Sequence, residues 1–208
     1  MITLAFPKGR ILKESLAIFN KAGYDFTPLL DDDRKLKFEF KDLGFMVMLL
    51  KPFDVPVYVE RGCADFGVVG KDVLMERKSD VLMLLDMNIG KCRISVAKPK
   101  NKIYEEKNRI KVGTKFTNIA KTFYENKGLN ADIIKLEGSV ELAPLMGISD
   151  VIVDIVSSGE TLRKNGLEEV EKICDISSYL IGNRNFFKVN FQHAIKIINT
   201  IKEVIDGN

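Results

Sequence analysis

The sequence predicts an α/β fold with largely parallel sheets, in two lobes of which the second is inserted into the first. Short apolar runs alternate with segments of helical periodicity along the 208 residues, a pattern typical of parallel strands joined by helices. A polar, charge-rich stretch at 98–109 indicates a change of lobe. The amphipathic tail has no sheet of its own to cover, so we expect it to return to the first lobe, with a cleft between the lobes. The expected boundaries are 1–95 plus 179–208 for the first lobe and 96–178 for the second.

The first lobe begins with the apolar run ITLAF, which is typical of a buried strand. An amphipathic pattern follows it and stops at Gly23, a residue that commonly ends helices. Two further apolar runs flank a turn and predict a hairpin-like pair. The expected elements are strands at 2–6, 38–42, 44–50 and 65–70 and helices at 11–22 and 55–62.

The second lobe repeats this alternation. Its clearest helix has Thr117 as a candidate N-cap, apolar Ile119 and Phe123 four residues apart, and Gly128 as a stop. In the tail, apolar residues recur at helical spacing from Phe191 to Ile205, which predicts a core-facing helix. The expected elements are strands at 93–97, 110–114, 131–138 and 151–156 and helices at 117–128, 139–147 and 190–207.

Composition excludes several classes of protein. A hydrophobic content of 46% with 29% charged residues is ordinary for a globular domain. The net charge is only +3 and the lysines are spread along the chain, which argues against a nucleic-acid-binding face. No apolar run approaches the roughly 18 residues of a membrane span. The first ten residues, MITLAFPKGR, reach a proline and two cations too early for a signal peptide, so we expect a cytoplasmic protein.

The residues that most often bind metals or act as bases are scarce. The three cysteines are far apart and lack metal-binding spacing, so neither a disulfide framework nor a zinc site is expected. The single histidine, His193, lies in the predicted tail helix, where a surface or packing role is expected. An enzyme with this composition should run chemistry that needs no strong general base. Displacement at a sugar anomeric carbon by an unprotonated ring nitrogen meets that condition, with Mg²⁺ assisting the departure of pyrophosphate.

The segment DVIVDIVSSGETL (150–162) is the strongest candidate site. Asp154 lies near the carboxyl end of a buried strand, where open α/β sheets bind ligands. The small residues Ser157, Ser158 and Gly159 can present backbone amides to an anion such as a phosphomonoester, and Asp154 could accept hydrogen bonds from sugar hydroxyls. The alternative is an ordinary strand–turn–helix in which Ser158 only caps the helix.

The segment PKGR (7–10) is a second candidate because it also follows a strand and precedes a helix. Lys8 and Arg10 would then lie at a strand's carboxyl end, and guanidinium groups match pyrophosphate oxygens well. An exposed basic turn is the alternative. A third segment, ERGCADFGVVGKDVL (60–74), combines an apolar strand with Lys71 and Asp72 but has neither the GxGxxG nor the P-loop order.

Taken together, these segments resemble the ATP phosphoribosyltransferase family, whose members catalyse the first step of histidine biosynthesis. The most specific match is the pattern E-x5-G-x-S-x2-I-x-D-I-x2-S-G-x-T-L from Glu141 to Leu162. Supporting matches are LAFPKGRI near the start, DRKLKF at 33–38, the segment 54–74 and CRISVA at 92–97. The resemblance implies attack of N1 of ATP on C1 of phosphoribosyl pyrophosphate (PRPP), giving phosphoribosyl-ATP and pyrophosphate.

The resemblance also implies roles for individual residues. Arg10 and Arg34 would bind the leaving pyrophosphate as the catalytic residues, while Gly70 and Asp72 would line the ATP side. No role for Glu141 follows from its match. The loop from Ser157 to Thr161 would hold the 5-phosphate of PRPP, and Asp154 its ribose hydroxyls. The residues that would bind PRPP are Lys8, Asp154, Ser157, Ser158, Gly159, Glu160 and Thr161.

The family further implies a fold of two lobes like a type II periplasmic binding protein, with the active site in the cleft between the lobes. Mg²⁺ would be bound through the substrate, with no protein side chain as a direct ligand. The chain resembles the short form, which lacks the histidine-sensing domain and works with a regulatory subunit similar to histidyl-tRNA synthetase. A homodimer of catalytic subunits is also implied.

Two rival functions remain open at this stage. A two-lobed solute-binding or sensor module would have the same architecture, since fold does not determine function, although no signal peptide or DNA-binding helix pair is seen. A phosphoribosyltransferase acting on another base is the second rival. Its usual loop has two adjacent acids, whereas only Asp154 stands in that place here.

Overall fold

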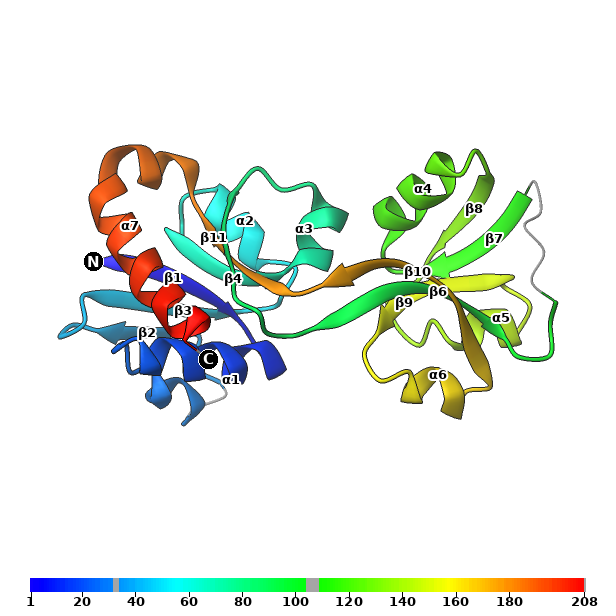
Figure 1. The fold of residues 1–208 in the computed structure, drawn as a ribbon, viewed down its shortest axis with the longest axis horizontal. Coiled ribbons are helices and arrows are strands. Elements are labelled where there is room, and N and C mark those ends of the chain that lie inside the picture. The colour runs from blue at the N-terminus through cyan, green and yellow to red at the C-terminus, as the bar shows by residue number, and fades with distance from the viewer. Residues whose placement is uncertain (32–33, 104–108, 208) are drawn as a thin grey trace. The chain divides into compact units, whose positions relative to one another are not determined.

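A computed structural model describes residues 1–31, 34–103 and 109–207 of the chain. They form two compact units, the first comprising Met1–Gly90 with Ser177–Asn208 and the second Lys91–Ile176 (Figure 1). The boundaries expected after residues 95 and 178 instead fall inside strands β6 (Cys92–Pro99) and β11 (Ser178–Gly182). The charge-rich stretch at 98–109 therefore belongs to the second unit and does not link the units; its residues 104–108 lie outside the described part.

The first unit contains a six-stranded sheet in the order β2-β3-β1-β4-β11-β5. β1 pairs in parallel with both β3 and β4, and the hairpin expected around residue 43 is the antiparallel pair β2–β3. The strands are β1 (Ile2–Pro7), β2 (Lys37–Phe40), β3 (Phe45–Leu50), β4 (Phe66–Gly70), β5 (Leu82–Asp86) and β11. The helices are α1 (Arg10–Lys21), η1 (Thr27–Leu30), α2 (Val55–Glu60), α3 (Lys71–Arg77) and α7 (Arg184–Asp206).

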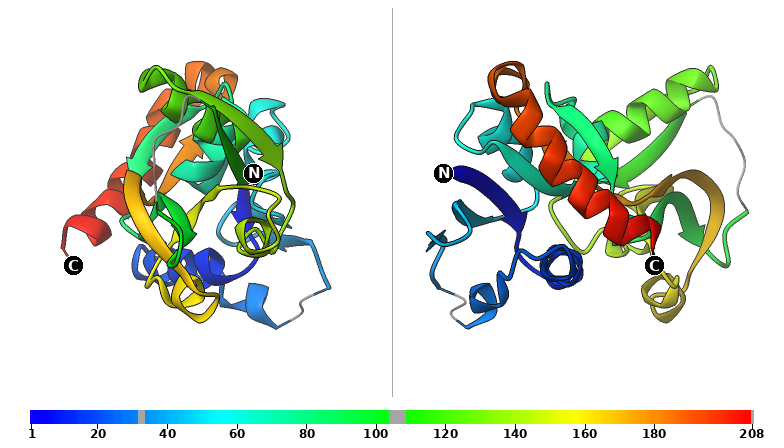
Figure 2. Two further views of the ribbon diagram at one scale, coloured as in Figure 1. Left: turned by 90° about the vertical axis from the view of Figure 1, so that its right-hand side faces the viewer. Right: turned by 60° about the vertical axis from the view of Figure 1, so that its left-hand side comes forward.

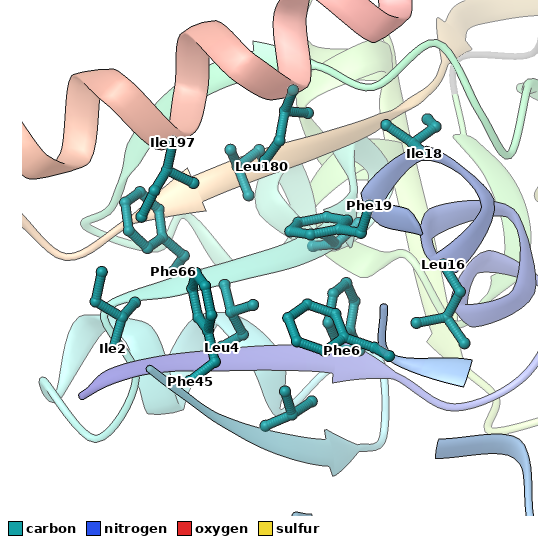
Figure 3. Packing of buried hydrophobic residues seen from close by; sticks show 14 of the residues in the cluster. Ile2, Leu4, Phe6, Leu16, Ile18, Phe19, Phe45, Phe66, Leu180 and Ile197 are labelled. Atoms are coloured by element: carbon teal, nitrogen blue, oxygen red, sulfur yellow. The ribbon is translucent and has the colours of Figure 1, made fainter. Parts of the chain in front are cut away.

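Helices cover both faces of this sheet because its strands bury alternate residues in two clusters. On one face, Leu4 and Phe6 of β1 pack with residues of α1 and α7. Figure 3 shows Phe6 next to Phe19 of α1, and their ring centroids are 5.1 Å apart in an edge-to-face contact. On the other face, Ala5 lies in a cluster with residues of α2 and α3. The sheet is thus buried between helices on both of its faces.

The tail helix α7 lies in the first unit and begins earlier than the pattern predicted. Asn183 supplies the start, because its side chain accepts a hydrogen bond from the Phe186 N–H at 2.9 Å. The same side chain donates to the Val59 carbonyl at 2.8 Å, which ties α7 to α2. The helix changes direction at Asn190, whose backbone is not helical (Figure 2). In the described part of the chain, no helix has the length and apolar character to cross a membrane.

The second unit contains a five-stranded sheet in the order β10-β6-β9-β7-β8. β7 pairs in parallel with β8 and β9, while β6 runs antiparallel to both β9 and β10. The remaining strands are β7 (Arg109–Thr114), β8 (Asn130–Lys135), β9 (Val151–Val156) and β10 (Leu167–Ile176). The helices are α4 (Thr117–Asn126), α5 (Leu142–Leu145) and α6 (Glu160–Lys164).

Each sheet has a point where the chain reverses the direction in which it adds strands. In the first unit β3 lies on one side of β1 and β4 on the other, and in the second unit β8 and β9 flank β7 in the same way. Ligands of open α/β sheets bind at the carboxyl ends of the strands beside such a point. The topology therefore predicts ligand binding at the loops after β1 and β4 in the first unit and at the loops after β7 and β9 in the second.

Candidate functional site

The loop after β1 carries Lys8, Gly9 and Arg10, all of them exposed. The Lys8 N–H donates to the Leu50 carbonyl at 2.8 Å, which holds the loop against the end of β3. Gly9 has a φ of 104°, a backbone conformation that side chains disfavour, and α1 begins directly after it. The glycine thus permits the sharp turn that brings two cations to the carboxyl edge of the sheet.

Arg10 is the first residue of α1, where a cation is unfavourable for the helix dipole. Its Nε lies 3.7 Å from Glu14 Oε1 one turn later, and its side chain is 61% exposed. Glu14 Oε2 in turn accepts a hydrogen bond from the Gly90 N–H at 2.7 Å. Glu14 therefore offsets the positive charge of Arg10. It also links Arg10 to Gly90, the last residue before the chain enters the second unit.

A pocket of 250 Å³ adjoins this loop in the first unit. It combines leucine side chains with two lysines, so it suits a ligand that has an apolar or aromatic part and a negative charge. Its lining consists of Lys8, Gly9, Leu12, Lys13, Leu29, Leu30 and Leu49.

The β4–α3 junction places Gly70 and Asp72 beside the β1 loop, because β4 is the parallel neighbour of β1. Asp72 lies in the first turn of α3 and is only 9% exposed. Its negative charge stabilises the amino-terminal end of the helix, where the helix dipole is positive. Its Oδ1 is 2.1 Å from the position that a Cβ on Gly70 would take. Only glycine at position 70 accommodates the carboxylate where it lies.

The remaining predicted residue of the first unit, Arg34, is exposed and precedes β2. The motif that predicted it begins at Asp33, which lies outside the described residues. The sequence therefore remains the main reason to include Arg34 in the site.

In the second unit, the loop after β9 has the small, exposed residues expected of an anion site. Ser157, Ser158 and Thr161 are exposed, and Gly159 takes the left-handed conformation with φ 72° just before α6. The Glu160 N–H donates to Ser158 Oγ at 3.3 Å, but Gly159 occupies the N-cap position and makes no side-chain cap. Capping by Ser158 is thus a weak local contact that leaves the loop accessible.

Two arginines hold the carbonyl groups of this loop. Arg93 Nη1 donates to the Ser157 carbonyl and Arg163 Nη1 to the Ser158 carbonyl, each at 3.1 Å. A Cβ on Gly159 would come within 3.2 Å of Arg163 Nη1, so the glycine leaves room for the guanidinium. Carbonyl oxygens repel a phosphate. Their engagement by guanidinium groups therefore favours a loop that meets an anion with its amides.

Asp154 lies in β9, beside the carboxyl end of β7 and close to Lys115, the residue that follows β7. Burial raises the pKa of its carboxyl. A 2.8 Å hydrogen bond from the Ile155 N–H and the positive charge of Lys115 act in the opposite direction. The negative charge of Glu141 raises this pKa further, so the structure brings Glu141 near Asp154. Two acidic residues of the 141–162 pattern, Glu141 and Asp154, thus lie close enough to interact electrostatically.

Sequence reasoning missed the basic residues that surround this site: Lys115, Arg93 and Arg163. Lys115 could have been found from the rule for carboxyl ends of parallel strands, since IKVGT was recognised as a strand. Thr114, the last residue of β7, is buried and donates from Oγ1 to the Val153 carbonyl at 2.6 Å, which joins β7 to β9. Arg93 lies in the segment CRISVA, which matched the family, but the match suggested no function for it.

The chemistry available to these two sites is binding and charge stabilisation. Among residues 1–31, 34–103 and 109–207, no group of three or more histidine, cysteine, aspartate or glutamate side chains is placed to hold a metal ion. His193 is exposed on α7. The first unit offers cations and a carboxylate at the ends of β1 and β4. The second offers a loop of small, exposed residues whose Ser157 and Ser158 carbonyls accept hydrogen bonds from arginines, with a partly buried carboxylate nearby.

Comparison with known proteins shows the family of the chain. The family model for ATP phosphoribosyltransferase matches residues 51–206. A protein of Citrifermentans bemidjiense called ATP phosphoribosyltransferase is 46% identical over 208 residues, which cover 98% of each chain.

Solved structures show the same architecture. The ATP phosphoribosyl transferase (HisG:HisZ) complex of Thermotoga maritima contains a chain that is 33% identical, with a TM-score of 0.85 and coverage of 100% of this chain and 98% of that one. The periplasmic aliphatic sulphonate binding protein SsuA of Escherichia coli is 12% identical with a TM-score of 0.61, covering 98% of this chain and 68% of its own. The predicted fold class, two α/β lobes like those of a periplasmic binding protein, is confirmed.

Proposed function

The chain belongs to the ATP phosphoribosyltransferase family, and we propose that it is a catalytic subunit of the short form. It joins C1 of the ribose of PRPP to N1 of the adenine of ATP and releases pyrophosphate, the first step of histidine biosynthesis. The observation that carries the proposal is the loop Ser157–Thr161 after β9, with Asp154 beside it. These residues form the most specific part of the family pattern and lie at the carboxyl end of a strand next to the reversal point of the sheet.

The loop would bind the 5-phosphate of PRPP, and Asp154 the hydroxyls of its ribose. The amides and hydroxyls of Ser157, Ser158, Gly159, Glu160 and Thr161 would supply donors without bulk. Lys8, in the first unit, is a further proposed PRPP-binding residue. A carboxylate next to the ribose also suits the transition state, because positive charge develops at C1 as pyrophosphate departs.

The leaving group and the acceptor would be handled by the first unit. Arg10 and Arg34 would bind pyrophosphate, since guanidinium groups form paired hydrogen bonds with its oxygens. Gly70 and Asp72 would line the ATP side. Adenine N1 is unprotonated at neutral pH, so the reaction requires no general base. Because no general base is needed, the exposed position of His193 on α7 is compatible with this reaction.

Mg²⁺ fits this site as part of the substrate. The pyrophosphate of PRPP is itself a good ligand for a hard cation, and the ion would enter the site bound to it. Bound there, the ion would supply neutralisation of the charge that develops on the leaving group. The side chains of this chain would orient PRPP through its phosphate and ribose.

We also propose a partner and a location. The similar chain of Thermotoga maritima was solved in a HisG:HisZ complex, and we propose that this chain pairs with a regulatory subunit of that kind, similar to histidyl-tRNA synthetase, around a homodimer of catalytic subunits. Because both substrates are cytoplasmic metabolites, the enzyme would act in the cytoplasm.

Pyrophosphate release tests the function directly. We expect the purified chain, alone or with the regulatory subunit, to release pyrophosphate only when ATP, PRPP and Mg²⁺ are all present. Mass spectrometry should identify the second product as phosphoribosyl-ATP. Absence of ATP-dependent PRPP turnover under both conditions would overturn the proposal, and turnover with another base in place of ATP would redirect it.

The Gly70→Ala substitution tests the ATP side. The new Cβ would meet Asp72 Oδ1 at 2.1 Å, so the carboxylate must rotate away while the rest of the fold remains. We expect the KM for ATP to rise about 10-fold, the cost of roughly one charge-assisted hydrogen bond, with little change in the KM for PRPP. The Asp72→Asn variant should act through the same contact. The double variant should therefore be no worse than Asp72→Asn alone, and additive losses would contradict this account.

A further inference from the structure

Arg93 is the basic residue in the CRISVA segment for which the family match suggested no role. It lies on β6, and its guanidinium makes two hydrogen bonds with the carboxylate of Glu169 on β10, from Nε to Oε1 at 2.6 Å and from Nη2 to Oε2. Its remaining nitrogen, Nη1, donates to the Ser157 carbonyl at 3.1 Å. One guanidinium therefore joins a carboxylate 76 residues away in the sequence to the first residue of the loop that follows β9.

A third residue holds the carboxylate from the other side. Ser95, two residues further along β6, is fully buried and donates from Oγ to Glu169 Oε1 at 2.7 Å. The hydrogen bonds from Arg93 lower the pKa of Glu169, and Ser95 and the charge of Arg93 act in the same direction. The same contact raises the pKa of Arg93. Both groups are therefore charged at neutral pH, and a bidentate pair with a third donor has a fixed geometry.

The neighbouring ion pair provides a contrast within the same two strands. Lys98 of β6 contacts Glu168 Oε1 of β10 and also donates to the Lys102 carbonyl at 2.7 Å. Glu168 thus lies on the same strand as Glu169, has the same charge, and also pairs with a basic residue of β6. Its partner contacts the segment after β6, whereas the partner of Glu169 contacts the loop after β9.

We propose that Arg93 and Glu169 are positioning residues for the phosphate-binding loop: Glu169 fixes the guanidinium of Arg93, which holds the Ser157 carbonyl and thereby presents the amides of the loop to the 5-phosphate of PRPP. This inference rests on the proposed function of the loop. Neither side chain needs to touch the substrate. The pair acts by preorganisation, since a loop that is already ordered loses less conformational entropy when the phosphate binds.

The test compares Glu169→Gln with Glu168→Gln as the matched control. The 5-phosphate is bound equally in the ground state and in the transition state, so a misplaced loop should raise KM without lowering kcat. We expect Glu169→Gln to raise the KM for PRPP about 10-fold, with kcat and the KM for ATP within about 2-fold of the wild type. Glu168→Gln should change none of the three. Partial unfolding would instead reduce kcat through loss of active protein and leave KM unchanged.

Two further measurements keep the outcome decisive. Arg93→Lys retains the cation but cannot reach Glu169 and Ser157 together, so it should raise the KM for PRPP similarly, and the double variant should be less than additive. Amide hydrogen exchange over residues 156–162, measured without substrate, should be faster in Glu169→Gln than in the wild type and unchanged in Glu168→Gln. This second measurement needs no catalytic activity.

The results separate failure of the inference from failure of the proposed function. An unchanged KM for PRPP in Glu169→Gln, or equal effects of the two glutamine variants, overturns the positioning role while the enzyme activity stands. If the wild type has no ATP-dependent PRPP turnover, the proposed function fails; faster exchange in Glu169→Gln alone would still support the role of the pair in ordering the loop, and unchanged exchange would overturn it.

Discussion

Replacing Asp154 by asparagine should lower kcat/KM for PRPP about 100-fold and, at neutral pH, make the fold more stable. The loss of activity follows from the proposed contact with the ribose. A charged carboxylate that accepts two hydroxyl hydrogen bonds contributes about 3 kcal/mol, and a neutral amide cannot offset the positive charge that develops at C1. Steady-state kinetics with PRPP as the varied substrate measure this effect.

The gain in stability follows from the raised pKa of Asp154. Burial disfavours the ionised carboxylate in the folded state, so the folded protein binds the proton more tightly than the unfolded chain, whose carboxyl titrates near 3.8. The favourable contribution is fully present below that value and is lost as the pH rises through the raised, folded-state pKa. Asparagine has no such dependence. The Tm of Asp154→Asn should therefore exceed that of the wild type at pH 7, and the difference should shrink in acid.

Asp150 offers the matched control for this prediction. It lies just before β9, at the opposite end of the strand, is exposed, and accepts a hydrogen bond from the Lys111 N–H at 2.9 Å. Asp150→Asn keeps an acceptor for that N–H and lies away from the loop, so neither turnover nor the pH dependence of Tm should change appreciably. An Asp154→Asn enzyme with wild-type kinetics would remove Asp154 from the site, and an unchanged Tm at pH 7 would contradict the unfavourable burial.

The loops that the sequence singled out as candidate sites are short and local. The loops after β1 and β9 each combine an apolar strand, a glycine at positive φ and polar residues within a few positions, so their chemistry can be read from neighbouring letters. The hairpin β2–β3 is equally local, with Gly44 at φ 72° in its turn. Such turns can be predicted from a single sequence because turn geometry depends on a few adjacent residues.

The elements that sequence reasoning missed depend on partners far along the chain. β10 has the sequence LEEVEKICDI, whose charged residues hide any alternation, and it is an edge strand with two irregularities in its pairing with β6. β5 and β11 pair with each other, although about 90 residues separate them, and α3 has only seven residues. Helix α7 starts at Arg184 because Asn183 caps it, while the apolar pattern rises only from about residue 190.

The missed site residues have the same origin. The proposed role of Arg93 depends on its contacts with Glu169 and Ser157, and Lys115 lies close to Asp154 because β7 and β9 are parallel neighbours. A single sequence shows neither proximity. The polar stretch 98–109 was interpreted as a possible linker, whereas the chain passes between the two compact units after Gly90 and after Ile176, next to the ends of the paired strands β6 and β10. Backbone pairing, and not composition, determines where one unit ends.

Replacing Arg10 by alanine should have the second large effect, a fall of about 100-fold in kcat with little loss of stability. If Arg10 binds the pyrophosphate as it leaves, its paired hydrogen bonds strengthen as negative charge grows on the leaving oxygen, so they favour the transition state over the ground state. Loss of about 3 kcal/mol corresponds to the expected factor. The side chain is 61% exposed and its ion pair with Glu14 spans 3.7 Å, so the fold should tolerate its removal.

Pyrophosphate itself distinguishes this role from a general loss of positive charge. Product inhibition by pyrophosphate should weaken in Arg10→Ala by about the same factor as turnover, while the KM for ATP should stay near the wild-type value. Arg34→Ala should show the same pair of changes if both guanidinium groups bind the leaving group. Arg10→Lys should recover only part of the activity, because an ammonium group cannot make the paired contact.

Arg61 is a suitable control because it is exposed and lies between α2 and β4, at the amino-terminal edge of the sheet. Its removal changes the net charge by the same amount at the end of the sheet where parallel strands do not bind ligands. Arg61→Ala should therefore leave kcat and pyrophosphate inhibition unchanged. If Arg10→Ala reduces turnover but leaves pyrophosphate inhibition intact, the arginine acts on another part of the substrate. Equal losses in Arg10→Ala and Arg61→Ala would show that the overall charge of the unit, and not a specific contact, is responsible.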